Sequence, residues 1–87
     1  MERRIGTAIV LVKSKENIDR LNTVLTTHGD IIIGRQGIPL RERQINIISL
    51  VVFGSTDEIG SLTGKIGNLS GIEVKSVLTK YSIENEE

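Results

Sequence analysis

The sequence contains no cysteine and no tryptophan, and only one phenylalanine, one tyrosine and one proline. The absence of cysteine excludes a disulfide framework, a cysteine-ligated zinc site, an iron–sulfur cluster and a thiolate nucleophile. The scarcity of aromatic side chains leaves few platforms on which bases or sugars could stack. Eleven Lys and Arg residues balance eleven Asp and Glu residues, so the chain lacks the basic excess that nucleic acids and anionic membranes attract. We therefore expect no direct nucleic-acid partner and no membrane partner.

Long apolar runs are also missing. The longest runs, residues 5–12 and 47–53, are far shorter than the roughly 20 residues of a membrane-spanning helix. Arg3 and Arg4 precede the first run, but no cleavage site typical of a secretion signal follows it. We expect a cytoplasmic protein.

Aliphatic residues are abundant instead, because 29 of the 87 residues are Val, Ile or Leu. Most of them are β-branched, which favours strands. The length allows one domain, residues 1–87, and a domain of this size is marginally stable alone and gains from self-association.

The hydrophobic periodicity predicts four strands and two helices. Ser14 is the expected N-cap of the first helix, which His28-Gly29 ends with a left-handed glycine. Ser55 and Glu58 match a capping box at the start of the second helix, and Ser70-Gly71 ends that helix. The expected strands cover residues 5–13, 31–38, 44–53 and 72–81, with a frayed tail over about residues 82–87.

The order β-α-β-β-α-β predicts an α+β ferredoxin-like sandwich, a four-stranded antiparallel sheet with both helices on one face. The first and third strands should be central, and Pro39 fits the end of an edge strand. Both faces of the central strands are apolar, yet two helices can cover only one of them. The other face should form an oligomer interface, because a large exposed apolar patch marks an interaction surface. The pattern leaves open which face the helices cover; we assign the interface of a homodimer or homotetramer to one set of residues: Ala8, Val10, Val12, Ile48, Leu50 and Val52.

Residues that could perform catalysis or bind a metal are sparse. His28 is the only histidine, and the nearby acids give no metal-ligand spacing. We interpret it as a helix-end or surface residue, and we expect no catalytic residues, no metal and no cofactor.

Two segments have unusual compositions. Gly60, Gly64 and Gly67 occur on one side of the second helix, where each costs about 0.8–1 kcal/mol relative to alanine. This cost indicates either close approach to another element or subunit, or backbone exposed to a small molecule beside Lys65. Residues 34–43 concentrate three of the six arginines, of which Arg35 and Arg41 suit a carboxylate or phosphate; the alternative is a solvated hairpin whose arginines pair with acids.

Three stretches, RQGIPLRE (35–42), DEIGSLTGKIG (57–67) and GIEVKS (71–76), resemble a small family of proposed iron-only hydrogenase system regulators. That family is similar to ACT domains and to the C-terminal domain of the nickel-responsive regulator. The resemblance covers about residues 4–77 and implies an ACT-like ferredoxin fold, oligomerisation through sheets and a regulatory role without catalytic residues.

The chain departs from those relatives in ways that affect function. One histidine and no cysteine cannot supply the ligands of a nickel sensor. Only four residues precede the first expected strand, so we expect any DNA contact to be indirect. The turn at residues 13–16 lacks the glycine beside which many ACT domains bind amino acids.

We therefore expect a non-enzymatic module that is a transcriptional or metabolic regulator, acts as an oligomer and responds to a small-molecule effector. The alternative is a pure interaction module that docks on a regulator or an enzyme without a ligand of its own. If a ligand site exists, we expect Arg35, Gly37 and Arg41 to meet Gly60, Gly64 and Lys65 across a subunit interface.

Overall fold

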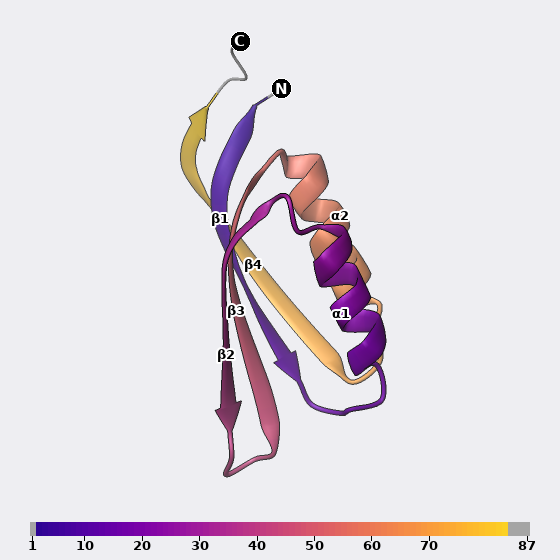
Figure 1. Cartoon of the computed structure of the whole chain (residues 1–87). Coiled ribbons are helices and arrows are strands. Elements are labelled where there is room, and N and C mark those ends of the chain that lie inside the picture. Colours follow the sequence, from indigo (N-terminus) through magenta and orange to yellow (C-terminus); the bar gives the residue numbers. More distant parts are fainter. Residues whose placement is uncertain (1, 84–87) are drawn as a thin grey trace.

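The computed structural model of the chain describes residues 2–83. The chain alternates strands and helices in the expected order, and Figure 1 shows both helices on the same side of one sheet. The elements are β1 (Arg3–Val12), α1 (Ile18–Thr27), β2 (Ile32–Leu40), β3 (Ile45–Gly54), α2 (Thr56–Gly67) and β4 (Ile72–Ile83).

The sheet has the strand order β2-β3-β1-β4, with each neighbouring pair antiparallel. β1 and β3 are therefore central, and β2, which contains Pro39, is an edge strand, where a residue without an N–H is tolerated. The predicted ferredoxin-like α+β fold is confirmed.

The start of α2 matches the sequence prediction closely. The Ser55 Oγ accepts a hydrogen bond from the Glu58 N–H (3.1 Å), and Glu58 Oε1 accepts one from the Ser55 N–H (2.9 Å). This reciprocal capping box satisfies two backbone donors at the helix end. Asp57 and Glu58 also lie in the first turn, where their negative charges interact favourably with the positive end of the helix dipole.

The two ends of α1 differ from the prediction. The N-cap is Asn17 rather than Ser14, because Ser14 accepts a local hydrogen bond from the Glu16 N–H (3.2 Å) and so forms a turn before the helix. The Asn17 side chain donates to the Ser70 carbonyl (2.9 Å), which ties α1 to the turn before β4. At the other end Gly29 does not adopt a positive φ, because its N–H donates to the Thr26 carbonyl (3.1 Å) in a tight turn.

β4 extends further than the sequence indicates. Ser82 and Ile83, which we assigned to the tail, pair with Arg4 and Arg3 of β1. The register shifts by two residues between these pairs and the pair of Gly6 with Leu78, so the extension follows an irregularity that no periodicity reveals. The rest of the expected tail, 84–87, lies outside the described residues.

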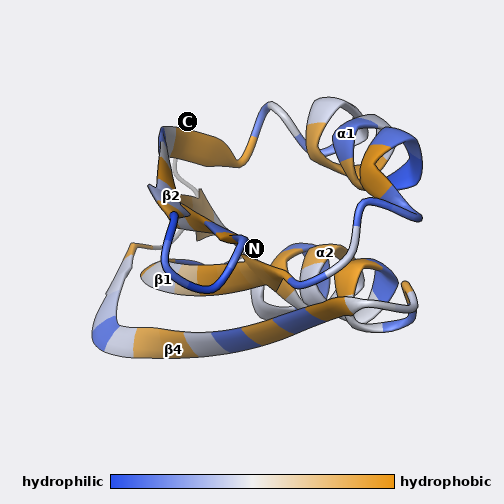
Figure 2. Ribbon diagram, turned by 90° about the horizontal axis from the view of Figure 1, so that it is seen from below, coloured by the Kyte–Doolittle hydropathy of each residue, from blue (hydrophilic) through white to orange (hydrophobic). Residues whose placement is uncertain are grey.

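The hydrophobic core lies between the helices and the face of the sheet that they cover. α1 contributes Leu21 and Leu25, and α2 contributes Ile59, Leu62 and Ile66, the residues that the helical periodicity selects. Figure 2 shows hydrophobic positions on both helices and along the strands. From the sheet, the buried members are Ala8, Val10, Val12, Leu50, Val52 and Ile72, with Ile48, Val74 and Leu78 packed beside them.

This core overturns the predicted position of the oligomer interface. Five of the six residues assigned to that interface are buried under the helices and the sixth, Ile48, packs against them: Ala8, Val10, Val12, Ile48, Leu50 and Val52. The assignment was wrong because the central strands are largely apolar on both faces. The edge strand β4 distinguishes the faces, since it places Val74 beside Val10 but the charged Lys75 beside Ile9.

The opposite face of the sheet carries no helix, and we call it the open sheet face. Its residues on the two central strands are Ile5, Thr7, Ile9 and Leu11 of β1 and Ile45, Ile47, Ser49, Val51 and Phe53 of β3. The structure also contains no helix, among residues 2–83, that is long and apolar enough to cross a membrane.

Candidate functional site

The open sheet face is built from rows of residues that stand side by side across the strands. One row joins Ile38, Ile47 and Leu11, and a second joins Val51, Thr7 and Val77. Ile9 at the centre is 45% exposed and Val51 is 41% exposed. The central strands therefore present aliphatic surface to solvent, which is the feature expected of an interaction surface.

The polar groups on this face would add only a small desolvation cost if a partner covered it. The Thr7 hydroxyl already donates to the Leu50 carbonyl (2.8 Å) within the chain. None of the nine residues is charged; the charged residues of the face are Glu73 and Lys75 on the edge strand β4 and Arg3 at the start of β1. At one end of the face, the Arg3 guanidinium lies 4.3 Å above the centre of the Phe53 ring.

A second feature is a hollow between the β2–β3 hairpin and the segment joining β1 to α1, which lie at the same end of the molecule (Figure 1). We call it the hairpin hollow. Its outer part, of about 620 Å³, is lined by residues 12–15, 39–41 and 44–46. Its inner part, of about 300 Å³, continues under α1 and shares Val12, Pro39 and Asn46 with the outer part.

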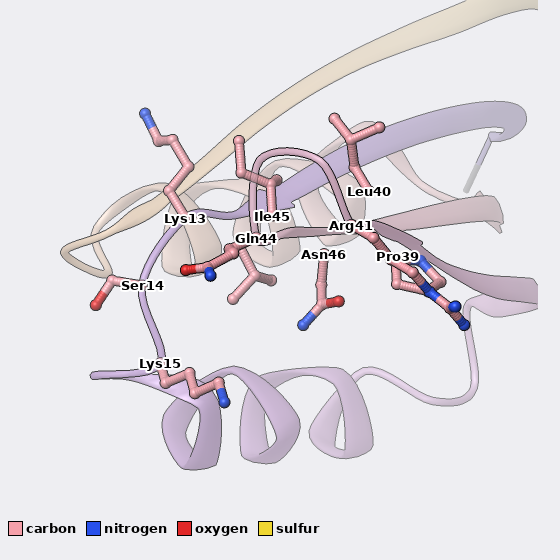
Figure 3. A pocket seen from close by; sticks show the side chains of 10 residues that line it. Lys13, Ser14, Lys15, Pro39, Leu40, Arg41, Gln44, Ile45 and Asn46 are labelled. Carbon is pink, nitrogen blue, oxygen red and sulfur yellow. The ribbon is translucent and has the colours of Figure 1, made fainter.

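The lining of the hairpin hollow is positively charged. It includes Lys13, Lys15, Arg35 and Arg41, and it contains no aspartate or glutamate. Lys13 points away from the hollow (Figure 3) and pairs with Glu73 at 3.3 Å, which is the one ion pair among residues 2–83. The other three cations therefore have no acidic partner in the described part of the chain.

Figure 3 shows how the polar side chains of the outer part are arranged. The Asn46 amide points from β3 into the space between the hairpin and α1, and Lys15 extends along the α1 side of that space. Arg41 reaches in from the turn after β2. These donors come from two segments that are distant in the sequence, the β1–α1 turn and the β2–β3 hairpin.

The structure divides the predicted ligand residues into two groups. Arg35 and Gly37 line the inner part of the hairpin hollow, and Arg41 lines its outer part. Gly60, Gly64 and Lys65 are on α2 and line neither part. The expected meeting of the two groups across a subunit interface stays a prediction.

The α2 glycines are not explained by packing within the chain. A Cβ atom added at Gly60 or Gly64 would meet no heavy atom within 4 Å, and one at Gly67 would lie 3.5 Å from the Val74 Cγ1, an ordinary contact. Close approach to the sheet or to α1 is therefore not the reason for these residues.

Sequence reasoning missed Lys15 and Asn46 as lining residues. The signal for Asn46 was present, because this residue interrupts the apolar helix-facing row of β3 that continues with Ile48, Leu50 and Val52. The signal for Lys15 was absent, because only the sheet order brings its turn beside the hairpin.

His28 is the C-cap of α1, as the sequence suggested. Its Nδ1 lies 2.9 Å from the Val24 carbonyl oxygen, which can only accept, so Nδ1 carries the proton. Nε2 lies 3.4 Å from the Ser61 Oγ. Both ring nitrogens thus have partners within the chain, and residues 2–83 contain no group of His, Cys, Asp or Glu side chains able to hold a metal ion.

Comparison with solved structures extends the fold assignment. The uncharacterized protein TM1266 from Thermotoga maritima is 34% identical, with a TM-score of 0.84 over 90% of this chain and 99% of that chain. The C-terminal domain of the MgtC protein from Mycobacterium tuberculosis has a TM-score of 0.63 at 9% identity, over 90% of this chain and 89% of that chain, which shows a shared fold alone. The comparison with curated proteins found no match.

Comparison with family models agrees with the resemblance carried by residues 35–42, 57–67 and 71–76. The model described as "TM1266-like: Iron-only hydrogenase system regulator, putative" matches residues 4–76, which include every strand and helix up to the middle of β4. The chain therefore belongs to the TM1266-like family.

Proposed function

We propose that this chain is a non-catalytic regulatory module that assembles as a homo-oligomer through the open sheet face and responds to a small-molecule effector. The regulatory role follows the description of the family, which names the iron-only hydrogenase system as the regulated process. The oligomer and the effector are our additions, and each rests on a separate feature of the structure.

The observation that carries the proposal is the open sheet face. Ile9 and Val51 lie on the central strands β1 and β3, yet both are more than two-fifths exposed. Complete burial of a Val or Ile side chain contributes about 1.5–3 kcal/mol, so each half-exposed residue here would add about 1 kcal/mol. A second copy of the chain offers a matching apolar surface and brings no net charge to it.

The hairpin hollow supports the effector. A pure interaction module without a ligand, the alternative function, needs only the open sheet face and gives no reason for a cationic hollow on the other side of the sheet. We therefore favour a module that has both an assembly surface and a ligand site.

The assembly is tested by the mass of the wild-type protein in solution at micromolar concentration, measured by light scattering. We expect a dimer or a tetramer of the 9.6 kDa chain. The double variant Ile9→Lys/Val51→Lys should shift the mass to that of a monomer, because it places two ammonium groups in the interface.

The matched control is Thr27→Lys, which adds the same side chain at an exposed position at the end of α1. It should leave the mass unchanged. Circular dichroism establishes that the double variant keeps its secondary structure. A wild-type monomer would overturn the proposal without any variant, and so would a folded double variant that keeps the oligomeric mass.

A further inference from the structure

We propose that the hairpin hollow binds a small organic anion, with a carboxylate or phosphate group held by Arg41 in the outer part and an apolar body extending under α1. This inference rests on the proposed function, because it specifies the chemistry of the effector. It concerns a site within one chain, so it does not require the oligomer.

The charge of the lining is the first argument. The chain as a whole has no net charge, but the hollow collects Lys15, Arg35 and Arg41 without one carboxylate in its lining. A lining with several cations and no acid has a positive potential that attracts an anion. An oxyanion carries the negative charge, and the planar guanidinium of an arginine can bind it through two parallel hydrogen bonds.

The second argument is the position of Asn46. Its backbone pairs with that of Val12, on the row of β3 that elsewhere faces the core with apolar side chains. Asn46 itself is exposed and lies outside the core, and its amide provides a neutral donor that points into the hollow (Figure 3). Cationic and neutral donors thus surround one space.

The third argument is the difference between the two parts of the hollow. The outer part has three cations, Lys13, Lys15 and Arg41, whereas the inner part has one, Arg35, and is lined mostly by aliphatic residues such as Ile18 and Leu21. Gly37 borders the inner part, and a Cβ added there would meet nothing within 4 Å. The more cationic outer part and the more apolar inner part match a ligand with one anionic end and one aliphatic or aromatic end, and volumes of this size are usual for small-molecule sites.

Binding is tested by isothermal titration calorimetry on the whole wild-type chain with four probes. The carboxylate probe is 4-methylpentanoate, and its neutral amide, 4-methylpentanamide, has the same shape without the charge. The phosphate probes are phenyl phosphate and inorganic phosphate, which lacks an apolar body. We expect at least one of the two organic anions to bind. An anion that binds should do so at least about tenfold more tightly than its own comparison probe, the amide or inorganic phosphate, which corresponds to about 1.4 kcal/mol.

Three variants locate the site. Arg41→Gln should weaken binding by about tenfold or more, because it removes a charged hydrogen-bond donor. Arg43→Gln is the matched control: it removes the same charge from the same turn at an exposed residue that does not line the hollow, and it should leave the dissociation constant within about twofold. Gly37→Val should abolish binding without a change of charge, because its side chain occupies the inner part.

Equal binding of the amide and the carboxylate, equal losses in Arg41→Gln and Arg43→Gln, or no binding of either organic anion at millimolar concentration would overturn the inference. The same samples are measured by light scattering. If the oligomer persists while no anion binds, the ligand site is wrong and the module without a ligand is favoured. If the wild-type protein is a monomer that binds the anion, the assembly is wrong and the site stands.

Discussion

Gly71, in the turn between α2 and β4, is the residue at which backbone geometry constrains the side chain most strongly. Its φ is +82°, and a Cβ atom added there would lie 2.7 Å from the Ser14 Cβ. Its carbonyl also accepts a hydrogen bond from the Lys13 N–H (2.8 Å), which joins this turn to the end of β1. The turn therefore needs glycine for both conformation and space.

We expect Gly71→Ala to lower the free energy of unfolding by about 2 kcal/mol or more, since the left-handed conformation alone costs a residue with a Cβ about 1–2 kcal/mol. Urea denaturation measures the change. The double variant Ser14→Gly/Gly71→Ala should recover the part of the loss that is due to contact between the two side chains. If Gly71→Ala lowered the free energy of unfolding equally in the wild-type and Ser14→Gly backgrounds, the result would contradict a close contact between the two side chains.

Ser55 combines burial with capping, because it is 4% exposed and its side chain accepts from the Glu58 N–H. Ser55→Ala should destabilise the protein by about 1–2 kcal/mol, because the Glu58 N–H at the start of α2 loses its partner. Thr56→Ala, at the adjacent exposed position, should change stability by less than about 0.5 kcal/mol. Thermal and chemical denaturation check both values, and a Ser55→Ala protein as stable as the wild type would show that the cap contributes nothing.

At the scale of elements, α2 is unusual because it contains glycines in its interior. Gly60 and Gly64 have open space where a side chain would be, so their cost in helix propensity is not offset by packing in the chain. The two helices therefore differ: α1 carries ordinary side chains on its exposed side, whereas α2 leaves part of its backbone accessible.

Gly60→Ala and Gly64→Ala should each raise the free energy of unfolding by about 0.8–1 kcal/mol, the difference in helix propensity between glycine and alanine. Chemical denaturation measures this change, provided that the variants and the wild type have the same oligomeric mass. If either change instead lowers the oligomeric mass, the glycines serve close approach by a neighbouring subunit. That result would contradict the expected gain in stability.

At the scale of the whole molecule, the two surfaces differ in chemistry and lie on opposite sides of the sheet. The open sheet face has one charged residue on its central strands, Arg3 at the start of β1, whereas the hairpin hollow depends on Lys15, Arg35 and Arg41. Salt should therefore affect assembly and ligand binding in different ways.

We expect the oligomeric mass to be unchanged between about 0.1 M and about 1 M salt, where the Debye length falls from about 10 Å to about 3 Å, because apolar burial is not screened. Binding of the organic anion should weaken over the same range. Sedimentation velocity and calorimetry measure the two effects. Dissociation of the oligomer at high salt would contradict an apolar interface.

The extent to which sequence predicted this molecule depended on the range of the interactions involved. The capping box of Ser55 and Glu58 and the core stripes of α1 and α2 are local patterns, and the structure confirms them. Ser14 was wrongly expected to cap α1, since its side chain formed a competing turn that local pattern alone does not rank. Lys15 and Asn46 line the same hollow only because of the strand order, so no local sequence pattern indicates that they are neighbours.

The sequence by itself determined the order of elements, the ferredoxin-like fold and the surplus of aliphatic residues over what one face of a sheet can bury, because helical and strand periodicities are properties of neighbouring residues. Only the tertiary structure decided that Ala8 and Val10 lie under the helices while Ile9 and Val51 face solvent. Alternation gives each central strand two largely apolar faces, and only the packing of the helices covers one of them. The same packing placed the cations of the β1–α1 turn beside those of the hairpin.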